Sequence, residues 1–173
     1  WFSRSAWALQ AITTWWDQAY GGRKPEVWLP DYFCNQSAEP MRRVGVTPVH
    51  YPVRNDLDPD WETCDALAKN NAPPDLFILV HYFGHAANGQ AALDFCSRHG
   101  ALLLEDAAHI LLPENGIGKY GDFVFYSPHK MLAIPDGALL LANRYDQAMK
   151  PALINAISQL GAAPNATSWL IKR

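Results

Sequence analysis

The stretch ALLLEDAAH, residues 101–109, decides how this chain of 173 residues folds and where its chemistry lies. Ala101–Leu104 is an apolar run of strand length, and two carboxylates and a histidine follow it closely. An acidic pair directly after a buried strand is costly unless it is solvated or has a partner. Asp106 therefore has two interpretations from this stretch alone: a helix N-cap, where Asp is favoured, or a member of a polar site.

Outward from this stretch, helix-like and strand-like segments alternate. Helical spacing of apolar residues predicts helices over Ser5–Tyr20, Gln36–Val44, Asp60–Asn70, Ala87–His99 and Gln147–Leu160. Besides Ala101–Leu104, short apolar runs predict strands over Glu26–Leu29, Thr47–Val53, Leu76–His81, Asp122–Tyr126 and Ala138–Ala142. This alternation predicts an α/β fold of three layers, with a mostly parallel sheet and helices on both faces. Ligands of such sheets bind outside the carboxyl ends of the strands.

Composition narrows the class of protein. Hydrophobic residues make up 49% of the chain, with 7 Trp, 7 Tyr and 7 Phe, which suits one packed domain. The net charge of −3 gives no basic footprint for nucleic acid, and no apolar run is long enough for a membrane span. Cys34, Cys64 and Cys96 follow neither a disulfide nor a metal-ligand pattern, so we expect a reducing, cytoplasmic location and no metal.

A second polar segment, YSPHK at residues 126–130, also follows a predicted strand. A lone lysine in a loop is usually a solvated surface charge. Here, however, one strand end offers Asp106 and another offers Ser127 and Lys130. Because the carboxyl ends of parallel strands meet at one edge of a sheet, we expect these side chains to lie in one site.

Two other motifs carry less weight. GIGKYG, residues 116–121, matches a dinucleotide-binding pattern, but it precedes a strand instead of following one, so we interpret it as a glycine-rich loop. Ser127-x-x-Lys130 matches the nucleophile motif of penicillin-binding proteins, whose companion motifs are absent. His81 could face a ligand, although a polar loop or strand-end role is the simpler interpretation of this histidine.

The order of these motifs resembles the central stretch of the DegT/DnrJ/StrS sugar aminotransferases. EDAAH at 105–109, GD at 121–122, S-x-x-K at 127–130 and PDG at 135–137 occur in the family's order. SRSA at 3–6, WLPDY at 28–32, VGVTPV at 44–49 and VHYFG at 80–84 fit the same register. The resemblance runs from about Ser3 to Ala142 and implies the large domain of the aspartate aminotransferase fold, with pyridoxal 5'-phosphate as cofactor.

The resemblance implies catalytic roles for three residues. Lys130 would hold the cofactor aldehyde as a Schiff base and move a proton to and from the substrate carbon. Asp106 would keep the pyridine nitrogen protonated, because a carboxylate stabilises that cation. His109 would lie near the phenolic oxygen of the cofactor.

Other residues would bind the remainder of the cofactor. The hydroxyl groups of Ser5 and Ser127 and the backbone N–H of Ala6, at a helix N-terminus, suit the phosphate dianion. Phe33 is the expected ring to stack on the pyridine face, with Tyr32 as the alternative.

The chain departs from the family's pattern at three positions. Phe125 stands where the family has a serine before the lysine, and Ser127 occupies the spacing used by other aminotransferases of this fold. Cys34 stands at the place of the usual stacking aromatic, and Arg4 replaces the glycine of the phosphate-binding turn. These departures bear on individual contacts and leave the pair of Asp106 and Lys130 intact.

The expected function is an aminotransferase that moves an amino group from an amino acid donor to a keto-sugar or a similar ketone. One alternative is a non-catalytic or partner-dependent remnant of the fold that acts as a scaffold. Another is a different reaction of the same cofactor, such as dehydration or decarboxylation. The identity of the acceptor stays open.

From the resemblance we expect residues 1–160 to correspond to the large domain, 161–173 to form a weakly patterned tail, and the family's small C-terminal domain to be absent from this sequence. We expect either a part of a longer protein or a natural remnant. A homodimer with its active sites near the interface is also expected, since Trp7, Trp15 and Trp16 offer apolar area for a partner. The alternative is that all three tryptophans pack inside this chain.

Overall fold

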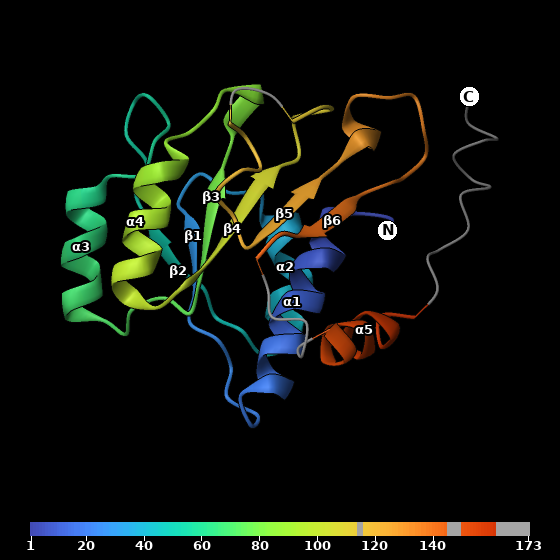
Figure 1. Cartoon of the computed structure of the whole chain (residues 1–173), viewed down its shortest axis with the longest axis horizontal. Helices are drawn as coiled ribbons and strands as arrows, with labels where there is room; N and C mark the ends of the chain where they lie inside the picture. Colours follow the sequence, from blue (N-terminus) through green and yellow to red (C-terminus); the bar gives the residue numbers. More distant parts are fainter. Residues whose placement is uncertain (114–115, 145–149, 162–173) are drawn as a thin grey trace.

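Six strands form one sheet in the order β2-β1-β3-β4-β5-β6 in the computed structural model, which describes residues 1–113, 116–144 and 150–161 (Figure 1). The strands are β1 (Val27–Pro30), β2 (Val49–Tyr51), β3 (Leu76–Val80), β4 (Leu102–Ala107), β5 (Phe123–Tyr126) and β6 (Leu139–Ala142). All neighbouring pairs are parallel except β5 and β6, which are antiparallel. The prediction of a mostly parallel sheet is confirmed.

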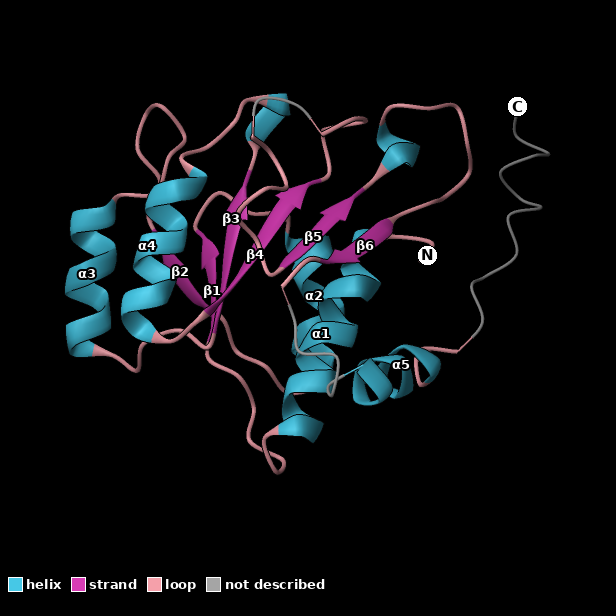
Figure 2. Ribbon diagram, viewed as in Figure 1, coloured by secondary structure: helices cyan, strands magenta, loops and turns pink. Residues whose placement is uncertain are grey.

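Helices cover both faces of this sheet (Figure 2). The helices are α1 (Ser5–Ala19), α2 (Asn35–Arg43), α3 (Trp61–Asn70), α4 (Gly89–His99) and α5 (Lys150–Ser158). Helices α3 and α4 pack on one face, while α1 packs on the other with α2 and α5 beside it. The three-layer prediction is therefore confirmed. None of the described helices is long and apolar enough to cross a membrane.

The core on the α1 face explains why the first helix forms. Its apolar stripe buries Leu9, Ile12 and Trp15 against β5, and the Trp15 ring meets the edge of Phe123 at 5.6 Å between centroids. Trp15 and Trp16 are 1% and 4% exposed, so these two tryptophans pack inside the chain. They do not supply the partner surface that we expected from them.

Local signals fix the start of α3 and both ends of α4. Asp60 caps α3 by accepting the N–H of Thr63, and Asn88 caps α4 in the same way from Ala91. Gly100, with φ of 69°, ends α4 in the left-handed conformation that glycine adopts readily. The start of the predicted last helix and, beyond Gly161, the predicted tail lie outside the described residues.

Strand β4 is longer than the apolar run that predicted it. It continues through both carboxylates to Ala107, and Asp106 pairs in register with Val80 of β3 and Phe125 of β5. The interpretation of Asp106 as a helix N-cap is wrong, because no helix begins there. Strand alternation sends Asp106 to the α1 face, together with Leu104, and Glu105 to the opposite face.

Candidate functional site

A pocket of about 240 Å³ lies at the carboxyl edge of the sheet. Its lining brings together Asp106, His109 and Lys130 with the aromatic residues Tyr32, Phe33, Tyr82 and Phe83. These side chains come from the ends of β1, β3, β4 and β5, as expected for a ligand site of a parallel sheet. Four of the residues singled out in the sequence, Phe33, Asp106, His109 and Lys130, thus share one cavity.

Asp106 is the carboxyl group of this pocket. Its Oδ1 accepts a hydrogen bond from the backbone N–H of Ala108 at 2.9 Å. Burial raises the pKa of Asp106, although the hydrogen bond from Ala108 and the charges of Lys130 and His109 oppose that shift. A cationic ligand group beside this carboxyl would offset the cost of burying its negative charge.

Lys130 reaches the same pocket from a short 3-10 turn, η2 (Pro128–Lys130), which follows β5. Its Nζ lies 3.4 Å from Nε2 of His109. Burial lowers the pKa of His109, and the charge of Lys130 lowers it further, whereas Asp106 acts in the opposite direction. His109 is therefore the neutral member of a triad whose other members are a carboxyl and an amine.

Phe83 is a contact of His109 that sequence reasoning missed. Its backbone N–H donates to Nδ1 of His109 at 3.2 Å, and the two rings lie parallel with centroids 5.9 Å apart. The backbone of Phe83 is left-handed, with φ of 53°, which is unusual for a bulky residue. Such strain occurs often at functional sites. The only signal in the sequence is the aromatic pair before Gly84, which does not specify this geometry.

The aromatic wall of the pocket is held by a hydrogen bond between its members. The hydroxyl of Tyr82 donates to the carbonyl of Tyr32 at 2.6 Å, and their rings stack at 5.4 Å. Phe33 is half-buried beside them and packs against the core of the α1 face. Both Phe33 and Tyr32, the expected and alternative stacking rings, line the pocket. Cys34, at the place of the family's aromatic, lines it too.

The three predicted phosphate ligands are not among the residues that line the pocket. Ser5 and Ala6 begin α1, whose N-cap Arg4 makes no side-chain capping bond. Ser127 follows β5, and strand alternation turns it toward the same face as Phe123 and Phe125, which is the face that α1 covers. The hydroxyl of Ser127 is buried and has no hydrogen-bond partner among the described residues. Such a group costs about 1–3 kcal/mol, which a ligand acceptor would recover.

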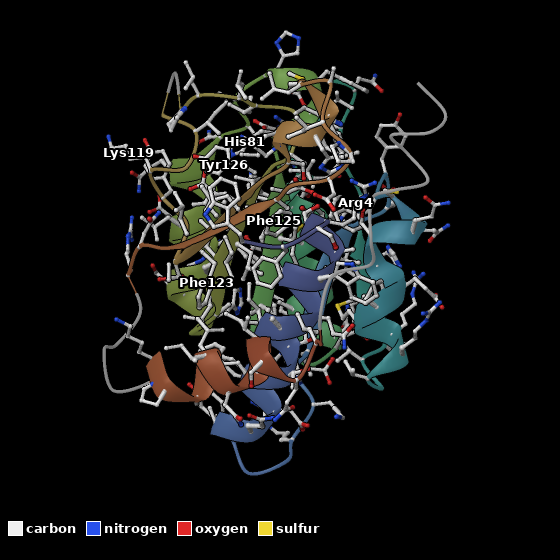
Figure 3. The ribbon with its side chains drawn as sticks, turned by 90° about the vertical axis from the view of Figure 1, so that its right-hand side faces the viewer. Arg4, His81, Lys119, Phe123, Phe125 and Tyr126 are labelled. Atoms are coloured by element: carbon white, nitrogen blue, oxygen red, sulfur yellow. The ribbon has the colours of Figure 1, made fainter. Side chains whose placement is uncertain are left out.

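Arg4 also lies at this end of the molecule. In Figure 3, Arg4, His81 and Tyr126 are toward the upper end and α5 is toward the lower end. The guanidinium of Arg4 donates to the carbonyl of Pro135 at 3.1 Å, which connects the start of α1 with the loop after Lys130. The substitution of glycine by arginine in this turn therefore creates a contact to the polypeptide.

His81, which could face a ligand, does line the pocket, but its ring is hydrogen-bonded to Glu105. Its Nε2 lies 2.8 Å from Oε2 of Glu105, and both side chains are buried. Glu105 entered the sequence analysis only as part of a motif, and the structure makes it a buried partner of His81. No local signal could reveal this pair, because Glu105 is on β4 and His81 directly follows β3.

Comparison with known proteins identifies the family of this chain. Residues 10–167 match the profile of the DegT/DnrJ/EryC1/StrS aminotransferase family. A pleiotropic regulatory protein of Geobacillus stearothermophilus is 32% identical over 147 residues, covering 79% of this chain and 38% of that protein. GDP-perosamine synthase of Caulobacter vibrioides is 28% identical over 158 residues, covering 86% of this chain and 40% of the synthase.

A solved structure shares the fold. Helicobacter pylori PseC, an aminotransferase involved in the biosynthesis of pseudoaminic acid, superposes with a TM-score of 0.70 at 20% identity, covering 88% of this chain and 41% of PseC. The chain thus spans about two-fifths of the length of the proteins that it matches. With the family's profile matched over most of its length, the chain belongs to the DegT/DnrJ/EryC1/StrS aminotransferase family.

Proposed function

We propose that residues 1–160 are the cofactor-binding large domain of a pyridoxal-phosphate-dependent aminotransferase. The observation that carries this proposal is the convergence of Asp106, His109 and Lys130 on one pocket. Family membership supports it, because aminotransferase chemistry depends on that cofactor. A scaffold would have no need for both the lysine and the carboxylate.

The residues of the pocket fit the cofactor. The carboxyl of Asp106, whose pKa burial raises, would be matched by a protonated ring nitrogen. The unpartnered hydroxyl of Ser127 would bind the phosphate together with Ser5 and the N–H of Ala6 at the start of α1. Phe33 would stack on the ring, with Tyr32 as the alternative.

Each side chain of the pocket then has its own role in the reaction. When bound, pyridoxal phosphate supplies the electron sink for bond breaking at the substrate carbon. Lys130 holds it in place through Nζ, and the same nitrogen moves the proton on and off the substrate carbon. Asp106 would keep the proton on the ring nitrogen, and His109 would lie near the phenolic oxygen. The aromatic residues around them limit access of water to these groups.

We further propose an amino acid as the amino donor and a keto-sugar as the acceptor. GDP-perosamine synthase and PseC, both similar to this chain, support a sugar acceptor by their names. We also propose that the protein is a cytoplasmic homodimer whose pocket lies near the subunit interface.

Reduction with borohydride tests the central assignment. Protein mixed with pyridoxal phosphate should absorb at the violet edge of the visible spectrum, and borohydride should fix the cofactor on one peptide. We expect that peptide to contain Lys130, and Lys130→Ala to abolish the labelling. Lys119→Ala, on the glycine-rich loop, is the matched control and should leave it unchanged. Labelling of a different lysine would show the assignment to be wrong.

One observation favours a second candidate, a non-catalytic descendant of the fold. A relative that is 32% identical to this chain is named as a regulatory protein. The same experiment separates the candidates, since a protein that has lost the cofactor site would give neither the absorbance nor the adduct.

A further inference from the structure

Glu105 is a buried carboxylate that the proposed chemistry does not use. It is fully buried on the face of β4 opposite to Asp106. Four donors converge on it: the ring of His81 at 2.8 Å and the backbone N–H groups of Gly118 at 2.8 Å, Tyr120 at 2.7 Å and Gly121. Burial would raise the pKa of Glu105, but these hydrogen bonds outweigh it and hold the pKa below its ordinary value. Glu105 is thus an ionised carboxylate that accepts hydrogen bonds from several parts of the chain.

The glycine-rich loop at residues 116–121 is shaped around this carboxylate. Gly118 has φ of 80°, and a Cβ there would collide with the hydroxyl of Tyr126. A Cβ on Gly121 would lie 2.6 Å from the carbonyl of Phe123 and 3.1 Å from Cγ of Glu105. The glycines of the G-x-G-x-x-G pattern therefore allow the backbone to approach an anion, and that anion belongs to the protein itself.

The hydrogen bonds of His81 determine which ring nitrogen carries its proton. The backbone N–H of Ala87 donates to Nδ1 at 3.1 Å, so Nδ1 has no proton. The proton is then on Nε2, which donates to Glu105. Because the ring bonds both Glu105 and Ala87, it closes the turn between residues 81 and 87.

Phe83, whose backbone N–H bonds His109, lies within this turn. The N–H of Phe83 donates to Nδ1 of His109, and a backbone amide cannot act as an acceptor in this contact. A neutral histidine accepts through one ring nitrogen only, so the proton of His109 is on Nε2. That nitrogen lies 3.4 Å from Nζ of Lys130, and its N–H can donate to Nζ only when Lys130 is the unprotonated amine, because an ammonium group cannot accept a hydrogen bond. The protonation pattern of His81 is thus repeated at His109.

We propose that Glu105 is a positioning residue for the active site. Through His81 it fixes the turn that presents the N–H of Phe83 to His109, and so keeps the proton of His109 on Nε2, facing the place where Lys130 holds its ligand. The significance of this for catalysis rests on the proposed function, but the positioning itself is a property of the protein without cofactor. Glu105 acts through a chain of hydrogen bonds and touches no reacting atom.

The experiment is ¹⁵N NMR of the imidazole nitrogens in the purified protein without added pyridoxal phosphate, with His81→Gln and His109→Gln spectra for assignment. We expect His81 and His109 each to show a protonated Nε2 and an unprotonated Nδ1. In Glu105→Gln the amide cannot accept from all four donors, so His109 should lose this single pattern and show an average of both tautomers. His81→Phe is a second variant, for use if Glu105→Gln does not fold. It keeps a ring of similar size, removes both hydrogen bonds of His81 and should have the same effect on His109.

The matched control is Asp122→Asn. Asp122 is likewise a partly buried carboxyl that accepts a backbone N–H, that of Leu103 at 2.8 Å, and it does not contact His81 or Glu105 through any of the described hydrogen bonds. His109 should keep its pattern in this variant. A proton on Nδ1 of either histidine in the unmodified protein, or an unchanged His109 in folded Glu105→Gln or His81→Phe, overturns the proposal. Since no cofactor is present, neither result depends on whether the protein is an aminotransferase.

Discussion

Asp106 and Glu105 are neighbours on one strand, and their carboxyl groups differ because the strand sends them to opposite faces. Glu105 meets four hydrogen-bond donors that keep it ionised. Asp106 accepts one backbone N–H and faces a pocket, where burial raises its pKa. A buried charge whose hydrogen bonds are all made stabilises a fold. A buried carboxyl whose cationic partner belongs to a ligand destabilises the ligand-free protein. The two residues thus serve stability and function separately.

The first prediction concerns Asp106→Asn. The pKa of Asp106 is raised in the folded state, so its ionisation costs stability at every pH above that value, and the cost vanishes below the ordinary value of 3.8. At neutral pH the ligand-free variant should therefore melt at a temperature equal to or above that of the unmodified protein. Aminotransferase activity should fall roughly a hundredfold or more, because an amide cannot hold the ring proton. A large drop in the melting temperature would instead mark Asp106 as a structural residue.

The second prediction concerns Glu105→Gln. The pKa of Glu105 is lowered in the folded state, so its ionised form contributes stability above the ordinary value of 4.5, and that contribution is lost as the pH falls through the lowered pKa. At neutral pH we expect the free energy of unfolding to drop by about 3 kcal/mol, since hydrogen bonds to a buried charge are lost. The difference between variant and unmodified protein should narrow on acidification. Denaturant unfolding over a range of pH measures it, and a difference independent of pH would contradict the prediction.

At the scale of elements, the sequence predicted the periodic features and missed those that depend on distant partners. The helical spacing of Leu9, Ile12 and Trp15 predicted α1, and Gly100 predicted the end of α4. The end of β4 was predicted too early because burying Glu105 in a strand is costly without partners, and its partners lie directly after β3 and on the loop before β5.

The sequence likewise predicted some features of the candidate site and missed others. Asp106 and Lys130 could be assigned to one edge because parallel strands end together. The contact from Phe83 to His109 could not, since a left-handed backbone at a bulky residue follows from the surrounding structure and has no local signal.

The third prediction belongs to the loop that joins β4 to β5. In Gly121→Ala the new Cβ would lie 2.6 Å from the carbonyl of Phe123, so the loop must move away from Glu105. We expect a loss of about 2 kcal/mol or more in the free energy of unfolding, within the range for overpacked sites. Gly100→Ala is the matched control: it meets open space and bears only the strain of a positive φ, about 1 kcal/mol. Thermal and denaturant unfolding should rank the two in this order, and the reverse order would show that the loop tolerates a side chain.

For the whole molecule, the two ends of α1 have different surroundings. Its first turn lies toward the carboxyl ends of the strands, whereas its last turn contacts α5 through a hydrogen bond from Asn155 to Gln18 (Figure 1). Exposed apolar residues gather in the chain next to the pocket residues: Leu111 and Leu112 follow His109, and Met131 and Leu132 follow Lys130. Because large exposed apolar patches are rare on monomers, these loops are better candidates for a subunit interface than the buried Trp15 and Trp16 of α1.

The last prediction tests that interface. Leu132 is 46% exposed beside Lys130, and Leu132→Asp would place a charge in the proposed contact between subunits. We expect light scattering at micromolar concentration to show a dimer for the unmodified protein and a monomer for the variant. Because each pocket would then lose its neighbouring subunit, the affinity for pyridoxal phosphate should fall together with the dimer. Ile154 on α5 is 55% exposed near the opposite end of α1, so Ile154→Asp is the matched control and should leave both properties unchanged. An unmodified protein that is monomeric at that concentration and still binds the cofactor would show that one subunit suffices to form the pocket.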